Sequence, residues 1–232
     1  LTVQSFNVNA YSDYQVNLVK NLAVYCAIAI ENATSYEKLE ERVNERTREI
    51  VRSHENTRLL GVIGQQIIST INFESIFEKL HANVSKLMNA DCFSVRIYNE
   101  EKQEIDYKYS FEKGQWMEPV TVSMENHDNF SVWCVRNKKE IFINDNLNEY
   151  QKYTTKIVVP RGEMPNSLLF CPMMIGERIV GVITVQSFEK FAYEPQHIDI
   201  LKTLGTYTAI ALENANLVEN LEDKVKERTT EV

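Results

Sequence analysis

The stretch SLLFCPMMIGERIVGVITVQSFEKFAYEPQHIDILKTLGTYTAIALENANL, residues 167–217, decides the fold. Two apolar runs, 167–175 and 178–188, flank the polar tripeptide GER, which is the pattern of a hairpin of buried strands. Pro195 stands where it would occupy the first turn of a helix, and apolar residues recur at helical spacing after it. The stretch therefore predicts a strand hairpin followed by a long helix.

Upstream of this stretch, two alternating segments predict further strands. Phe93, Val95 and Ile97 alternate with polar neighbours, and the same alternation recurs over 105–111. Shorter strands are expected at 120–123 and 140–145, and helices at 73–88 and 129–138. Together these elements predict an α+β fold. It has a central antiparallel sheet of five to six strands, most simply six, with flanking helices and long helices at both ends of the chain.

The chain repeats itself. Residues 1–50 align with residues 183–232 without a gap, at a constant offset of 182, and about half of the positions are identical. TVQSF at 2–6 returns at 184–188, and LEERVNERTREI at 39–50 returns as LEDKVKERTTEV at 221–232. This period is too long for a solenoid, so the repeat indicates duplication of a whole domain.

The repeat predicts four segments. Residues 1–34 are expected to be the C-terminal remnant of an upstream copy, and 35–55 a coiled-coil signalling linker. Residues 56–217 are expected to form one complete domain, and 218–232 to begin a second copy of the linker. The chain is accordingly interpreted as a fragment of a longer protein.

The linker carries the pattern of a coiled coil. Apolar residues at three-, four- and seven-residue spacing form an a/d seam interrupted by arginine, and this expected dimer and signalling helix comprises Tyr36, Leu39, Val43, Arg46, Ile50, Leu221, Val225 and Arg228. A continuous helix of about 55 residues would be roughly 80 Å long, which no core within one chain could cover. The sequence therefore predicts a homodimer through parallel helices, over 14–70 and 197–232.

Composition excludes several functions. The formal net charge is −8 and the pI about 5.2, so no nucleic-acid partner is expected. No apolar run reaches the roughly 18–20 residues that span a bilayer, so no membrane contact is expected in this fragment, and the predicted location is cytoplasmic. Cys26, Cys92, Cys134 and Cys171 are widely spaced and predict buried, reduced thiols without a metal site.

Residues 167–217 resemble the C-terminal half of the GAF family of small-molecule sensor domains, through Pro172, Gly176, Gly181 and the AIALENA helix. WCVRNKKEIFIND, residues 133–145, is similar to the helix–turn–strand segment of that family. The resemblance implies a GAF/PAS-like fold and a sensory function. Both linker copies are also similar to the coiled coil that joins sensor domains to kinase cores in bacterial histidine kinases, through the triplet Glu-Arg-Thr. This second resemblance implies that the chain is a non-catalytic signal-transmitting module of a two-component sensor histidine kinase.

A small-molecule pocket is expected on the sheet face opposite the long helices, with no cofactor identified. Its candidate residues are Arg96, Tyr98, Tyr107, Trp133, Tyr150 and Phe170, since aromatic walls with a few polar groups suit a small ligand. The alternative is that these aromatic residues only pack the core. The ligand, the output domain and the direction of signalling stay open at this point.

Other functions compete with the sensory one. A structural dimerisation module without ligand, and a GAF regulator of a cyclase or transcription activator, are the main alternatives. A thiol-dependent methionine sulfoxide reductase is more distant, because no base accompanies the cysteines in sequence. The cyclic-nucleotide motif of the family cannot be traced, and bilin attachment has no support. RSHENTRLL around His54 resembles a phosphoacceptor box, but Arg58 stands where proline is expected.

Overall fold

The computed structural model describes residues 1–8, 10–70, 72–159 and 162–230, with the side chains of 49, 52–56 and 222–230 outside the description. The chain divides into two units, Leu1–Arg58 and Leu59–Val232, and each is described by itself. Among the described helices, none combines the length and the apolar character needed to cross a membrane.

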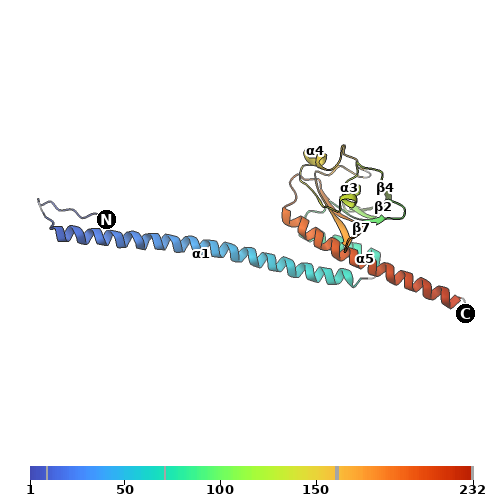
Figure 1. The fold of residues 1–232 in the computed structure, drawn as a ribbon, viewed down its shortest axis with the longest axis horizontal. Coiled ribbons are helices and arrows are strands. Elements are labelled where there is room, and N and C mark those ends of the chain that lie inside the picture. The colour runs from blue at the N-terminus through green and yellow to red at the C-terminus, as the bar shows by residue number, and fades with distance from the viewer. Residues whose placement is uncertain (9, 71, 160–161, 231–232) are drawn as a thin grey trace. The chain divides into compact units, whose positions relative to one another are not determined.

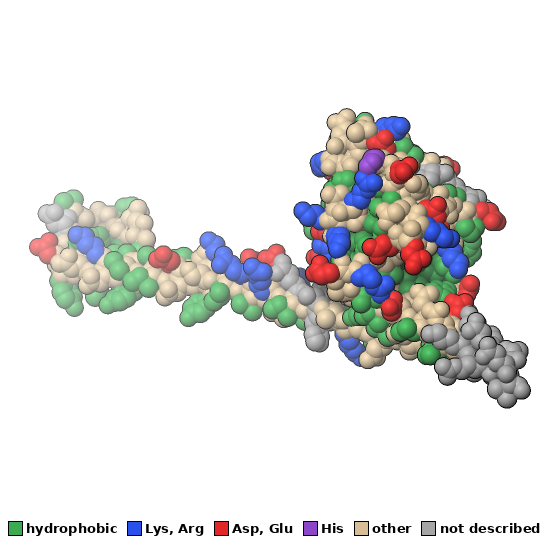
Figure 2. Space-filling model, turned by 45° about the vertical axis from the view of Figure 1, so that its right-hand side comes forward, with side chains coloured by type: hydrophobic (Ala, Val, Ile, Leu, Met, Phe, Trp, Pro, Cys, Tyr) green, Lys and Arg blue, Asp and Glu red, His purple; other side chains and the backbone are tan. Residues whose placement is uncertain are grey.

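The first unit is dominated by one helix, α1, which spans Asp13–Ile68 and continues into the second unit. Its start is capped locally, since the Ser12 hydroxyl accepts a hydrogen bond from the Gln15 amide at 3.4 Å. Large apolar side chains along α1 are exposed, among them Leu22 at 48% and Ile30 at 67%. Figure 2 shows them gathered along the helix.

The second unit is built on an antiparallel sheet (Figure 1). Its seven described strands are β1 (Cys92–Asn99), β2 (Glu104–Glu112), β3 (Gln115–Met117), β4 (Val120–Ser123), β5 (Ile141–Ile143), β6 (Ser167–Ile175) and β7 (Arg178–Ser187). The order is β3-β2-β1-β7-β6-β5, and β4 pairs with the other half of β2. The predicted α+β fold with its antiparallel sheet is confirmed.

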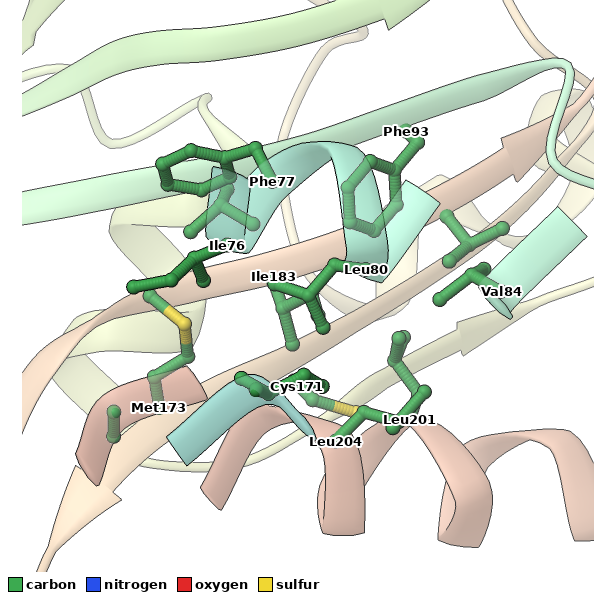
Figure 3. Close-up of a cluster of buried hydrophobic side chains, with 14 of the residues drawn as sticks. Ile76, Phe77, Leu80, Val84, Phe93, Cys171, Met173, Ile183, Leu201 and Leu204 are labelled. Carbon is green, nitrogen blue, oxygen red and sulfur yellow. The ribbon is translucent and has the colours of Figure 1, made fainter. Parts of the chain in front are cut away.

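One face of the sheet is covered by α2 (Phe73–Leu87) and α5 (Pro195–Thr230). Figure 3 shows Leu80 and Val84 of α2 and Leu201 and Leu204 of α5 converging on side chains of the sheet. Side chains at alternate strand positions, such as Ile183, point to this face because successive residues of a strand face opposite ways. Burial of this apolar layer is the main stabilising contribution to the unit.

The opposite face carries a second apolar cluster under α3 (Phe130–Asn137) and the following loops, which include α4 (Asn146–Glu149) and the short 3-10 helix η1 (Tyr150–Lys152). Val132, Cys134 and Ile141 are fully buried there. Figure 1 shows α3 and α4 on the other side of the sheet from α5. The unit thus has three layers, with the sheet in the middle.

Three details differ from the sequence expectation. Strand β3 was not expected, and the stretch 146–152, for which the sequence predicts no helix, forms α4 and η1. The expected strand over 140–145 is shorter, Ile141–Ile143. The helix expected at 73–88 is α2, and Asn72 caps its start by accepting a hydrogen bond from the Ser75 amide at 3.0 Å.

Candidate functional site

A cavity of about 90 Å³ lies on the face of the sheet that α5 does not cover. Strands β1, β2, β6 and β7 form its floor, and Ile157, Val158, Val159, Glu163 and Pro165, which precede β6, contribute to its wall. Binding sites for drug-sized ligands measure about 300–1,000 Å³, so this cavity admits only a small molecule.

Arg96 is the one basic residue among the described side chains that line the cavity. Its guanidinium group lies 4.0 Å from the ring centre of Tyr107 and 5.0 Å from that of Phe170. Its Nε donates to the Ser94 hydroxyl at 3.3 Å, and Nη1 donates to the Ser131 hydroxyl. Arg96 is only 9% exposed, and this burial lowers its pKa.

The backbone explains how these side chains meet. The pairing of β1 with β2 changes register between Val95 and Ile97, so Tyr107 and Lys108 stand opposite the single residue Arg96. Such a bulge re-aims side chains, and bulges are frequent beside binding sites. The Tyr107 ring is fixed in turn, because its hydroxyl donates to Asn129 Oδ1 at 2.9 Å.

Asn129 joins the cavity to α3. Its Oδ1 also accepts from the Ser131 amide at 2.9 Å, so it caps the helix. The cap holds Ser131, the hydroxyl partner of Arg96, at the first turn of α3. One asparagine side chain therefore positions both the aromatic and the hydroxyl partner of the buried guanidinium.

Asn146 brings the β5–α4 junction to the cavity wall. It is 1% exposed; its Nδ2 donates to the Pro165 carbonyl at 3.1 Å, while its Oδ1 has no hydrogen-bond partner. The preceding residues bind the loop that leads into α5. Asn144 exchanges hydrogen bonds with the Tyr193 main chain at 2.8 and 3.1 Å, and Asp145 pairs with Lys190 at 2.9 Å.

The structure brings together three of the six predicted pocket residues. Arg96, Tyr107 and Phe170 line the cavity. Tyr98, Trp133 and Tyr150 do not; they lie on the same side of the sheet and pack, partly buried, against the second apolar cluster.

Sequence reasoning missed polar residues of the cavity. The missed residues are Ser94, Ser110, Glu112, Glu118, Asn129, Asn146, Glu163 and Gln186. A signal existed for Ser94, because it and Arg96 are polar positions on a strand whose other residues are apolar. No comparable signal marks Asn146, because most of its neighbours in sequence are polar as well.

The predicted helix residues are exposed wherever their side chains are described. Exposed fractions are 73% for Tyr36, 56% for Leu39, 54% for Val43, 67% for Ile50 and 62% for Leu221, and Arg46 is exposed as well. The side chains of Val225 and Arg228, like that of His54, lie outside the described residues.

Cys26 on α1 is exposed, so the expectation of a buried thiol is wrong for this cysteine. The other three cysteines lie in the second unit, and burial raises the pKa of each thiol. Cys92 lines the cavity, and its pKa is raised to about 12. Cys134 and Cys171 are fully buried, and their pKa values are raised as well. Each thiol therefore holds its proton at neutral pH, which opposes nucleophilic chemistry. Within the described residues, no group of three or more His, Cys, Asp or Glu side chains could hold a metal ion.

A family model described as a GAF domain matches residues 70–213. The chain belongs to the GAF domain family. The matched residues include the whole sheet of this GAF domain and the residues that line the cavity. They also include α2 and the first half of α5, the two helices that cover the sheet.

Curated relatives of this GAF protein are transcriptional activators. The formate hydrogenlyase transcriptional activator of Salmonella typhimurium is 21% identical over 199 residues, 83% of this chain and 28% of the relative. The activator of the same description from Escherichia coli is 19% identical over 184 residues, 77% of this chain and 26% of the relative. The chain thus spans about a quarter of the length of these curated relatives.

Solved GAF structures share the fold at low sequence identity. The GAF domain of an Acinetobacter phosphoenolpyruvate-protein phosphotransferase has a TM-score of 0.55 at 16% identity, covering 70% of this chain and 95% of that one. The free methionine-R-sulfoxide reductase of Neisseria meningitidis, solved with its substrate, has a TM-score of 0.55 at 9% identity, covering 70% and 91%. At these identities the likeness concerns the fold alone.

Proposed function

We propose that this chain is a non-catalytic sensory module in which a small ligand in the Arg96 cavity alters the pairing of the helices that leave the domain. The observation that carries the proposal is the buried guanidinium of Arg96 in a cavity on a sheet whose other face is covered by α5. A ligand and an output helix can then act on the same strands from opposite sides.

Strand β6 gives the shortest route between the two faces. Phe170 lines the cavity, and its neighbour Cys171 lies in the apolar layer beneath α5. The Cys171 thiol is 3.9 Å from the Ile198 carbonyl of α5. A displacement of Phe170 by a ligand would therefore reach the start of α5 through adjacent residues of one strand.

A second route runs through the β5–α4 junction. Asn146 lines the cavity, while Asn144 and Asp145 hold the loop before α5 through Tyr193 and Lys190. Hydrogen bonds with two distinct arrangements are a recurrent means of coupling. This junction supports the same direction of transmission.

A second copy of the chain is the proposed partner of the exposed helices. The a/d positions of α1 and Leu221 of α5 are more than half exposed in one chain, as apolar residues of a dimer interface would be. A seam that also contains Arg46 is marginal, so two registers of similar energy are available to it. We propose a parallel homodimer through 14–70 and 197–232 whose register changes with ligand.

Two output classes remain. The resemblance of both linker copies to the coiled coil of sensor histidine kinases supports a two-component kinase as the parent protein. The curated relatives favour a transcription activator instead. The complete reading frame that contains this sequence distinguishes the two, and either output leaves the sensory proposal unchanged.

Spin-label distances test the sensory proposal directly. In a Cys26→Ser background, Leu221→Cys supplies one exposed thiol, because the other cysteines are buried. Native mass spectrometry first identifies any small molecule that purified protein retains. Removing and restoring that molecule is expected to change the distance between labels on the two copies.

Three results would redirect the proposal. A monomer in analytical ultracentrifugation at micromolar concentration would contradict the dimer. A dimer whose label distance ignores every ligand would favour a purely structural module. Methionine sulfoxide turnover that is lost in the triple variant Cys92→Ser, Cys134→Ser, Cys171→Ser would establish the thiol enzyme instead.

A further inference from the structure

The charge of Arg96 has no counter-ion among the described residues. Among the described residues its hydrogen-bond partners are two hydroxyls, and the ion pairs join other side chains. Arginine does not lose its proton in proteins, so the charge persists despite its burial. A buried charge without a partner is costly, which points to an anion that is bound in the working protein.

The remaining charges on the cavity wall limit that anion to a single negative charge. Glu112, Glu118 and Glu163 also line the cavity, so its wall carries three carboxylates. Glu112 Oε1 accepts from the Glu163 amide at 3.0 Å, and the Glu163 carboxylate pairs with Lys113 at 2.6 Å. A dianion such as phosphate would meet these carboxylates with one guanidinium to balance it, whereas a carboxylate carries the one charge that Arg96 neutralises.

Asn146 has a buried, unpaired acceptor that a hydrogen-bond donor on the same ligand would satisfy. Its amide orientation is fixed, because Nδ2 donates to the Pro165 carbonyl, and Oδ1 is left without a partner at 1% exposure. A buried acceptor that is left unpaired destabilises the fold, and a hydroxyl or amino group of a ligand would satisfy it. The small volume of the cavity, about 90 Å³, requires both ligand groups to lie on a short skeleton.

We propose that the cavity binds a small monocarboxylate that also carries an O–H or N–H group, with the carboxylate on Arg96 and the donor on Asn146 Oδ1. The class comprises short hydroxy acids and amino acids. This inference rests on the proposed function, because it names the ligand of the same cavity.

Propionate, lactate and alanine form a matched set for the test, since they differ only in hydrogen, hydroxyl or ammonium at one carbon. Isothermal titration of the 232-residue chain is expected to show binding of lactate or alanine, and weaker binding of propionate. Propionamide and lactamide, which lack the charge, are expected to bind at least about tenfold more weakly than the acids.

Variants separate the two contacts. Arg96→Met is expected to weaken binding of all three acids at least about tenfold, whereas Asn146→Ala is expected to remove only the advantage over propionate. Glu100→Gln changes a charge at the exposed β1–β2 turn, on a residue that does not line the cavity, and is expected to bind as the parent chain does. Equal binding of the acids and their amides would overturn the proposal.

The stability of the ligand-free protein gives an independent readout. If Arg96 serves a ligand, Arg96→Met removes a buried unpaired charge, and the Tm of the ligand-free chain is expected to be unchanged or higher. A marked fall in Tm would show that Arg96 is a structural residue and would overturn the proposal. A retained ligand without a carboxylate would overturn this inference alone, while label distances that ignore every bound ligand would overturn the sensory function.

Discussion

Leu22 and Leu204 occupy the same position of the repeat, yet Leu22 is 48% exposed on α1 whereas Leu204 is fully buried on α5. Another equivalent pair differs in the same way, since Ile30 is 67% exposed whereas Leu212 is 1% exposed. The apolar pattern of residues 14–34 therefore matches that of a helix which covers a sheet, and the covering face is open in this chain. The assignment of 1–34 to an upstream copy of the domain stays a prediction.

The pair gives a first prediction. Leu204→Ala is expected to lower the free energy of unfolding of the second unit by about 2–5 kcal/mol, because it leaves a cavity beneath α5. Leu22→Ala removes the same atoms from an exposed position and is expected to leave that unfolding transition unchanged. Urea denaturation followed by tryptophan fluorescence measures both, since Trp116 and Trp133 lie in the second unit. Equal losses in the two variants would contradict the burial difference.

Gly181 gives a second prediction. A Cβ at this position would overlap the main-chain oxygen of Arg96 on the neighbouring strand, and it would lie 2.8 Å from Met173 Cε. Backbone cannot move aside cheaply, so Gly181→Ala is expected to destabilise the domain by about 1–3 kcal/mol or more. Gly61→Ala is the matched control, because nothing lies within 4 Å of its Cβ position on α1. That control is expected to gain up to about 1 kcal/mol of helix stability.

His81 gives a pH prediction. Its ring lies 3.9 Å from that of Phe111, and burial lowers its pKa from the usual value of 6.5. The unfolded chain therefore takes up a proton at His81 at higher pH than the folded chain does. Its contribution to stability is complete above about pH 6.5 and is lost as the pH falls below that value.

Thermal unfolding between about pH 7.5 and 5.5 checks the sign of this dependence. The parent chain is expected to lose Tm as the pH falls, and His81→Phe, which keeps a ring against Phe111, is expected to lose less. A larger pH dependence in His81→Phe would mean that the histidine is stabilised in its charged form.

The thiols give a fourth prediction. Cys26 is exposed on α1, while Cys92, Cys134 and Cys171 are buried with raised pKa values. Because the pKa of Cys92 rises from 9.0 to about 12, its thiolate fraction near neutral pH falls by about three orders of magnitude. Ellman's reagent is expected to modify Cys26 first and the other thiols only on unfolding, and Cys26→Ser is expected to lose the early phase. Rapid labelling of Cys92 in the folded chain would reopen the thiol-enzyme alternative.

The parts of the fold that could be predicted from sequence are those with strong periodicity. The apolar hairpin of β6 and β7 and the helix after Pro195 follow from local pattern, because burial on both faces makes strands continuously apolar. Strand β3 has only three residues, and two of them are exposed, so no alternation marks it. Its pairing with β2 is set by the tight turn at Lys113 and Gly114, both with positive φ, rather than by hydrophobicity.

The cavity was predictable only where polar residues interrupt an apolar strand. Arg96 stands out on β1 as a basic residue in an apolar stretch. Which tyrosine ring packs against its guanidinium group depends on the bulge between β1 and β2, and no sequence pattern marks that bulge. Trp133 was expected in the pocket and instead packs against Tyr153, with ring centres 4.9 Å apart. Asn146 reaches the cavity through the fold of a loop, and its contact with Pro165 joins residues 19 apart in the chain.

Helix α5 covers the sheet and also leaves the domain, and among its side chains that are described, up to residue 221, the last buried one is Ala215. A chimera that joins this sensor to a foreign output therefore has a natural junction after that residue. A joint placed nearer Pro195 would replace side chains of the sensor's own core, and folding and signalling would fail together. A fusion design can thus keep the helix up to Ala215 as part of the sensor domain and replace the rest of the helix with that of another output protein.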